Sequence, residues 1–175
     1  MSEAIESTTE LLSLLAPILA RVAELDVEQR TTPEAIRELE ATLEREYPHA
    51  GSRVQAIGEL LARGVREGWL ADRGAPEARF GRLAKPGPAT CGLSIDIVSM
   101  IGAGIEHSHP HGEITIGFLA EPEDGPQSCH FESRPPGWVV LGPDSRHVPT
   151  VTGARMNLIY FLPGGAVEWH FPPRA

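Results

Sequence analysis

Apolar residues in the first part of the chain recur at helical spacing. The first stripe consists of Leu11, Leu14, Leu15, Ile18, Val22 and Leu25. Residues three or four positions apart lie on one face of a helix, so this stripe predicts an amphipathic helix with a buried face. Pro17 falls inside the stripe and has no amide hydrogen to donate, so the helix is expected either to kink or to begin near it.

Two further helices are expected before residue 75. The segment Thr32-Pro33-Glu34 is a helix start signal, because Thr caps free amides, Pro suits the first turn and Glu faces the positive helix end. A third helix is expected from Ser52 to Gly68, where glycine favours termination. The apolar stripes of these helices predict packing, either on the rest of the chain or on a second subunit.

The period of the hydrophobic pattern changes to two at Leu93. Short β-rich runs cover residues 93–98, 113–118, 138–141, 157–162 and 167–171. Segments with Gly and Pro, such as residues 123–126 and 163–165, predict turns between them. Several short strands at this spacing favour a β-sandwich or a β-barrel.

The predicted fold class is therefore α+β, with helices first and antiparallel strands second. We expect a helical region at residues 1–75 and a β-domain at residues 76–175. Residues 72–89 contain Gly, Pro and basic side chains and are predicted to form a connector. Within it, Arg79-Phe80-Gly81-Arg82 has two interpretations: a solvated basic loop, or a carboxylate clamp at the mouth of the β-domain.

The composition indicates a folded chain, since 41% of its 175 residues are hydrophobic. The formal net charge of −9 disfavours a nucleic-acid partner, because phosphate binding needs a concentrated basic face. We find no apolar run of the length that spans a bilayer, and the acidic N-terminus does not resemble a secretory signal. We therefore expect a cytoplasmic protein without a membrane partner.

The cysteine count supports the same compartment. Cys91 and Cys129 are too few for a disulfide framework, and neither lies in a C-x-x-C pair. Two free thiols are expected in the cytoplasm, while a single disulfide between them stays open at this point.

The segment richest in side chains that can bind a metal ion or transfer protons is His107-Ser-His109-Pro-His111-Gly-Glu113. Its three histidines and its glutamate occupy odd positions, which share one face of an extended strand, so these side chains are expected to converge. The alternating apolar residues after Glu113 would cover the opposite face, which leaves the histidine side facing a cavity. Pro110 and Gly112 are expected to bend the strand.

Three interpretations of this segment remain open. In the first, His107, His109, Glu113 and His147 bind a divalent metal ion, and the sequence does not choose among Fe, Mn, Zn, Ni and Cu. In the second, the same residues form a metal-free acid–base pocket. In the third, the segment is a surface turn without function. His111 would either contact a substrate at the cavity mouth or lie in solvent.

The spacing of these residues resembles the metal signature of the cupin superfamily. His107-x-His109, three intervening residues and Glu113 match its first motif, and Pro143-Asp-Ser-Arg-His147 matches the second with one residue fewer. The resemblance implies an antiparallel β-barrel of the jelly-roll type. It also implies a homodimer in which the N-terminal helices contribute to the interface.

A closer resemblance covers most of the chain. Residues 64–70, 79–82, 96–98, 109–114, 145–151 and 158–168 resemble the bacterial 4-hydroxylaminobenzoate lyase family. The resemblance implies conversion of 4-hydroxylaminobenzoate and water to 3,4-dihydroxybenzoate (protocatechuate) and ammonia, on a route of nitroaromatic degradation. It implies that Glu113 transfers protons, and that the histidines hold a metal ion or that His107 and His109 take over its tasks.

The same resemblance implies contacts with a small aromatic carboxylate. Arg79 or Arg82 would bind the carboxylate, and Phe80, Trp138 or Tyr160 would stack on the ring. Two other functions stay open: a different metal-dependent cupin enzyme, such as a dioxygenase or an isomerase acting on a small aromatic acid, and a non-catalytic cupin sensor of a small ligand.

Overall fold

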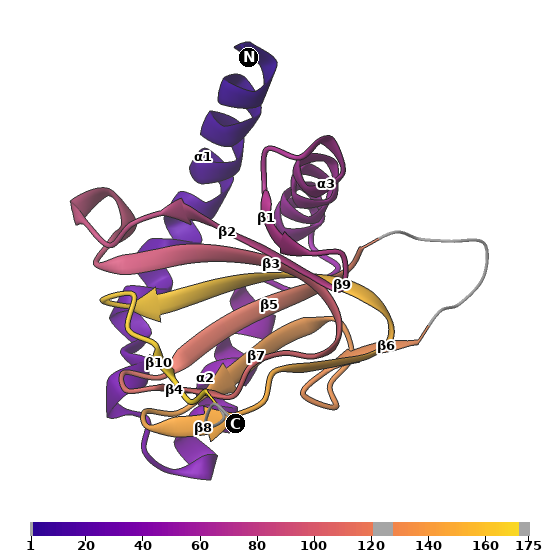
Figure 1. Cartoon of the computed structure of the whole chain (residues 1–175). Coiled ribbons are helices and arrows are strands. Elements are labelled where there is room, and N and C mark those ends of the chain that lie inside the picture. The colour runs from indigo at the N-terminus through magenta and orange to yellow at the C-terminus, as the bar shows by residue number, and fades with distance from the viewer. Residues whose placement is uncertain (1, 121–127, 172–175) are drawn as a thin grey trace.

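The computed structural model describes residues 2–120 and 128–171 and shows a helical N-terminal segment followed by antiparallel sheets (Figure 1). The helices are α1 (Ser2–Leu25), α2 (Pro33–Glu46) and α3 (Ser52–Glu67), with short 3-10 helices η1 (Val27–Gln29) and η2 (Pro88–Thr90). This order confirms the predicted mixed α+β class. The turn predicted at residues 123–126 lies outside the described residues.

The helix boundaries follow the capping signals. Thr32 Oγ1 accepts a hydrogen bond from the amide of Ala35 at 3.2 Å, and Pro33 opens α2. Gly68 ends α3 in the left-handed conformation, with φ of 81°. The expectation that the first helix begins near Pro17 is wrong, since α1 continues through it. Pro17 is exposed, so the hydrogen bond that it cannot make faces solvent.

The strands form two antiparallel sheets. The large sheet has the order β1-β2-β3-β9-β5-β7, with β6 beside β9, and the small sheet has the order β10-β4-β8. The large sheet consists of β1 (Arg73–Ala75), β2 (Ala78–Ala84), β3 (Leu93–Ala103), β5 (Glu113–Leu119), β6 (Cys129–Phe131), β7 (Gly137–Leu141) and β9 (Thr150–Pro163). The small sheet consists of β4 (His107–His109), β8 (Ser145–His147) and β10 (Glu168–Trp169).

The predicted connector at residues 72–89 is wrong in its first half. Strands β1 and β2 form a hairpin there, and β2 pairs with β3, with Ala78 opposite Met100. Backbone hydrogen bonds to β3, rather than a regular hydrophobic alternation, place this segment in the sheet.

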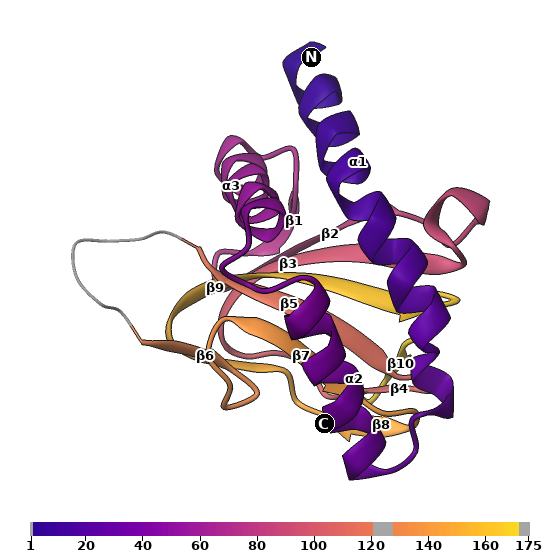
Figure 2. The same ribbon diagram turned by 180° about the vertical axis from the view of Figure 1, so that it is seen from behind.

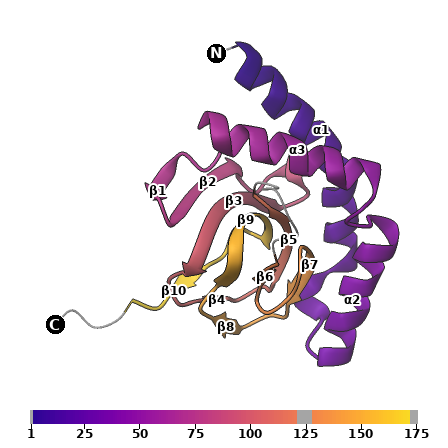
Figure 3. The same ribbon diagram turned by 90° about the vertical axis from the view of Figure 1, so that its right-hand side faces the viewer.

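The three helices cover one face of the large sheet, as Figures 2 and 3 show from two sides. Ile95, Ile114 and Ile159 of the sheet belong to the same buried core as Leu15 of α1 and Leu61 of α3. The helices therefore pack on the rest of the chain, and the predicted alternation in β3 and β5 is confirmed. The large sheet curves, and the small sheet lies across its inner face (Figure 3).

The structure also bears on membrane-spanning helices and on the two cysteines. Within residues 2–120 and 128–171, no helix has the length and apolar character needed to cross a membrane. Cys91 is exposed, Cys129 is buried, and both are free thiols, so the disulfide that the sequence left open does not form.

Candidate metal centre

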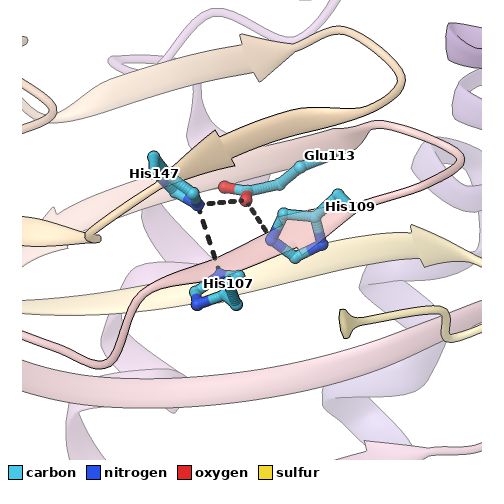
Figure 4. A group of neighbouring side chains, drawn as sticks. All are labelled: His107, His109, Glu113 and His147. Carbon is cyan, nitrogen blue, oxygen red and sulfur yellow. Dashed lines mark hydrogen bonds and ion pairs between the residues drawn. The ribbon is translucent and has the colours of Figure 1, made fainter. Parts of the chain in front are cut away.

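Three strands bring the four predicted ligands together (Figure 4). His107 and His109 lie on β4, His147 lies on β8 directly opposite His107, and Glu113 is the first residue of β5. One donor atom from each residue lies within 4.8 Å of all the others. The cluster is buried: Glu113 is 0% and His109 is 1% exposed.

A turn, and not one continuous strand, produces this convergence. The chain leaves β4 after His109 and turns through residues 110–112 into β5, which belongs to the other sheet. Gly112 has φ of 82°, and a Cβ atom at this position would lie 2.9 Å from Cγ2 of Val27. The bend expected at Pro110 and Gly112 is therefore present, and glycine is required at the second position.

Glu113 and His109 approach each other closely without forming a regular hydrogen bond. Oε2 of Glu113 lies 2.8 Å from Nε2 of His109 and 3.4 Å from Nε2 of His147. Although these distances are short, Glu113 Oε2 and both ring nitrogens of His109 have no partner in hydrogen-bond geometry among the described residues. Buried polar atoms are normally paired, and leaving one unpaired costs about 1–3 kcal/mol.

Such an arrangement suits a metal ion. Three imidazoles and one carboxylate, converging on one point, form a donor set that divalent transition metals use. The buried cluster of His107, His109, Glu113 and His147 can therefore bind a metal ion.

Neighbouring groups orient the ligand atoms. Nδ1 of His107 donates to the carbonyl oxygen of Ile105 at 2.8 Å, so the lone pair of the neutral ring is on Nε2, which faces the cluster. Thr115 Oγ1 donates to Oε1 of Glu113 at 2.5 Å and leaves Oε2 for the cluster. Both ligands thus present a free lone pair inward.

The charges of the cluster are coupled. Burial alone would raise the pKa of Glu113, but His109 and His147 outweigh it and lower the pKa to about 2. Burial alone would lower the pKa of His147, but the carboxylates of Glu113 and Glu132 raise it to about 9. Burial lowers the pKa of His107. Without metal at neutral pH, protonated His147 therefore donates from Nε2 to Nε2 of His107, 3.2 Å away.

Arg82 and Tyr160, two of the predicted substrate contacts, lie on the same face of the large sheet as the cluster. Arg82, Asp96, Tyr160 and Thr115 form one cross-strand row over β2, β3, β9 and β5. Thr115 and Glu113 are two positions apart on β5 and share this face. Tyr160 is buried, and Arg82 forms an ion pair with Asp96 at 2.7 Å.

Arg79 and Trp138 lie on the opposite face, toward the helices. Arg79 donates to the carbonyl of Val65 in α3, and Nε1 of Trp138 donates to the carbonyl of Tyr47 at 2.8 Å. Alternate residues of a strand point to opposite faces, so these side chains do not reach the cluster. Their contact with a substrate stays a prediction, and in this structure both side chains face the helices and not the cluster.

The remaining two predicted contacts are exposed. His111 lies in the turn between β4 and β5, where it forms an ion pair with Glu28 of η1. Its side chain is 49% exposed, so of the two expected positions the structure shows the solvent-facing one. Phe80 shares the face of Arg82 but is 48% exposed, and the guanidinium of Arg73 lies 5.2 Å from its ring centre.

Sequence reasoning missed two residues that touch the cluster. The Trp169 ring lies 5.0 Å from the ring of His107 and 6.3 Å from that of Phe171, and Trp169 is 53% exposed. Oε1 of Glu132 lies 3.6 Å from Nδ1 of His147. The aromatic pair near the C-terminus was a visible signal for Trp169. No sequence signal linked it to His107, because their contact depends on the pairing of β10 with β4.

Sequence comparisons with known proteins agree on one family. A family model described as 4-hydroxylaminobenzoate lyase matches residues 20–169. A protein of that name from Pseudomonas putida is 28% identical over 176 residues, which cover 93% of this chain and 95% of the relative. A second, from Nocardioides sp. (strain LMS-CY), is 30% identical over 160 residues, which cover 86% of this chain and 90% of the relative.

Solved structures show only weak likenesses to the chain, and one of them covers nearly all of it. That structure comes from a study of crystal structures of DMSP lyases and is 17% identical, with 96% of this chain and 100% of that chain covered. Its TM-score is 0.39, which identifies neither fold nor function.

Proposed function

The chain belongs to the 4-hydroxylaminobenzoate lyase family and is a lyase, and from this we propose that it converts 4-hydroxylaminobenzoate and water to protocatechuate and ammonia. The observation that carries the proposal is the family match over residues 20–169, which include all four residues of the buried cluster. The place of this reaction on a nitroaromatic degradation route is part of the proposal.

The reaction needs protons at the leaving oxygen and at the leaving nitrogen, and it removes protons from both added water molecules and from the ring carbon that gains oxygen. A proton on the hydroxylamine oxygen lets the N–O bond break and water leave. One water molecule then adds at the neighbouring ring carbon, and a second replaces nitrogen as ammonia before the ring regains its aromatic character. With one water released and two taken up, the sum consumes one water.

The residues of the cluster suit these transfers. Glu113 is ionised at neutral pH and lies where the donor atoms of the cluster converge, and from this position we assign it the proton of an attacking water molecule. The histidines are assigned the proton that the leaving oxygen needs, because His147 carries one at neutral pH in the metal-free form, with its pKa raised to about 9. If no metal is used, we assign to His107 and His109 the tasks of the metal ion, which are to bind the hydroxylamine oxygen or to activate water.

A divalent metal ion held by His107, His109, Glu113 and His147 would supply Lewis acidity to the hydroxylamine oxygen or to water. Under this assignment the chain itself orients the ligands. Thr115 holds one oxygen of Glu113, and Ile105 fixes the tautomer of His107.

The inner face of the large sheet provides a place for the aromatic acid. We assign the substrate carboxylate to Arg82, because Asp96 accepts from two of its five N–H donors and the described part of the chain shows no hydrogen bond from the others. Strand β2, which carries Arg82, is separated from β5 by three strand spacings, roughly 14 Å. Tyr160 lies between them in the same row and would contact the ring, with Phe80 at the exposed side.

We propose further that the two sheets form a cupin jelly roll, with the β-domain at residues 76–175. The four cupin-type ligands support this, because the structure brings them together from β4, β5 and β8. A homodimer through the helices, and a cytoplasmic location supported by the two free thiols, complete the proposal.

The proposal is tested by comparing two glutamate variants. Glu113→Gln removes the carboxylate of the cluster and should abolish formation of protocatechuate while the protein remains folded by circular dichroism. Glu106→Gln is the matched control, because Glu106 is half-buried and its carboxylate pairs with Arg146 outside the cluster. A near-normal rate in Glu113→Gln would rule out its role in proton transfer.

A further inference from the structure

A cavity lies on the helix-facing side of the large sheet. Its volume is about 490 Å³, within the range of small-molecule sites. Residues of α3, the β1–β2 hairpin, β3 and β9 line it. Among them are three arginines, Arg66, Arg79 and Arg155, and two polar residues, Ser99 and Asn157.

This cavity is separate from the metal centre. Arg79, Ser99 and Asn157 lie opposite one another across β2, β3 and β9. Asn157 is two positions from Ile159, which belongs to the core beneath the helices. Glu113 and Tyr160 point to the other face of the same sheet, so a ligand in this cavity would not touch the cluster.

The three guanidinium charges in the cavity wall are not neutralised. Arg155 donates to the carbonyl oxygens of Pro76 at 2.7 Å and Ser99 at 3.1 Å, and Arg79 donates to that of Val65. Carbonyl groups hold a guanidinium in place but carry no net charge. Within residues 2–120 and 128–171, none of the three arginines forms an ion pair, and no carboxylate side chain lines the cavity.

Excess positive charge around a cavity favours an anion. The chain as a whole carries a formal net charge of −9, so this local excess runs against the overall balance. Guanidinium groups bind carboxylates with two parallel hydrogen bonds. Arg66 is exposed at the rim and Arg79 is half-buried, so one could contact the anion from outside and the other from within.

Asn157 adds a second requirement. It is 1% exposed and lines the cavity, and its Oδ1 has no hydrogen-bond partner within residues 2–120 and 128–171. An unpaired buried amide oxygen is costly, and a hydroxyl group on a ligand would satisfy it. Small apolar residues form the remaining wall, namely Ala62, Val65, Ala75, Pro76 and Ala120. These residues suit a ligand whose middle part is apolar and whose two ends carry the anionic group and the hydroxyl group.

We propose that this cavity binds a small hydroxylated organic acid, with Arg66 and Arg79 at its carboxylate and Asn157 at its hydroxyl group. The site is distinct from the metal centre and takes no part in the chemistry assigned to it. Arg155 is held in place by backbone carbonyl groups, and its positive charge also favours binding of an anion in the cavity.

The test uses 4-hydroxybenzoate as the probe and the full-length protein, with binding followed by NMR of arginine Nε–H groups. Saturable shifts of the Arg66 and Arg79 signals are expected. Arg66→Gln should weaken binding about tenfold, the effect of one charge-assisted hydrogen bond. Arg53→Gln is the matched control: Arg53 lies on the same helix, binds the carbonyl of Leu14, and should leave the affinity unchanged.

Two further ligands, benzoate and inorganic phosphate, test the role of the hydroxyl group and the role of the apolar wall separately. Asn157→Ala should remove the preference for 4-hydroxybenzoate over benzoate, which has no hydroxyl group. Inorganic phosphate should bind more weakly than either aromatic acid. The proposal is overturned if Arg66→Gln binds as tightly as the unchanged protein, if phosphate binds best, or if Glu113→Gln abolishes the shifts. None of these outcomes depends on turnover at the metal centre.

Discussion

Metal binding at the cluster should displace a proton from His147. The perturbation is the addition of Zn²⁺ to protein stripped of metal. The pKa of His147 is raised to about 9, so at pH 7 this ring is about 99% protonated. A ring nitrogen must lose its proton to bind metal, whereas Glu113, with its pKa lowered to about 2, is already ionised.

The expected magnitude follows from these two values. His147 contributes about one released proton per metal ion at pH 7, and its contribution falls to about half at pH 9. While His147 remains protonated, this proton makes the apparent association constant rise about tenfold per pH unit.

Calorimetric titrations in buffers of different ionisation enthalpy count the protons. His147→Gln should release about one proton fewer than the unchanged protein. His130→Gln is the matched control, because His130 lies on β6 outside the cluster, and its count should not change. Equal counts for His147→Gln and the unchanged protein would refute the assignment of the proton to His147.

Three further predictions follow from single contacts. Thr32→Ala should lower the free energy of unfolding by about 1 kcal/mol in urea titrations, since it removes the cap of α2, whereas Thr31→Ala should leave it unchanged. Arg82→Gln should raise KM for 4-hydroxylaminobenzoate about tenfold with little change in kcat, because it removes binding shared by substrate and transition state. In metal-free protein, stability from Glu113 should be present above pH 4.5 and lost as the pH falls toward its lowered pKa of about 2. Stability from His147 should be present below pH 6.5 and lost as the pH rises through its raised pKa of about 9; acid and base denaturation followed by fluorescence checks both signs.

The helices were predictable because their signals are local. Thr32 caps the first turn of α2, and Gly68 ends the last turn of α3, so each residue acts on neighbours within one helical turn. Pro17 was harder to interpret. The free-energy cost of its missing helical hydrogen bond depends on whether that side of the helix faces solvent or the core. That orientation is a property of the packed structure.

The strands were predictable where one face is buried. Residues 93–98 and 113–118 alternate because their apolar side chains enter the core beneath the helices. The β1–β2 hairpin was missed because its pairing with β3 rests on backbone hydrogen bonds, which leave no hydrophobic period in the sequence.

The four candidate metal ligands were predictable from residue type and spacing. The residues that surround them were not. His107, His109 and Glu113 lie within seven residues, so a single turn suffices to bring them together. Which face Arg79 and Trp138 occupy depends on strand register, and which residue Trp169 touches depends on the pairing of β10 with β4. Register and pairing are set by the whole fold.

The most direct test is anaerobic turnover of 4-hydroxylaminobenzoate by the purified protein, stripped of metal and then reconstituted with single metal ions. Protocatechuate and ammonia should form in equal amounts without oxygen, with activity lost on chelation and restored by one metal. Activity that persists after complete metal removal would keep the lyase and assign the chemistry to Glu113 and the histidines alone. Failure to form either product in any state would contradict the proposed reaction.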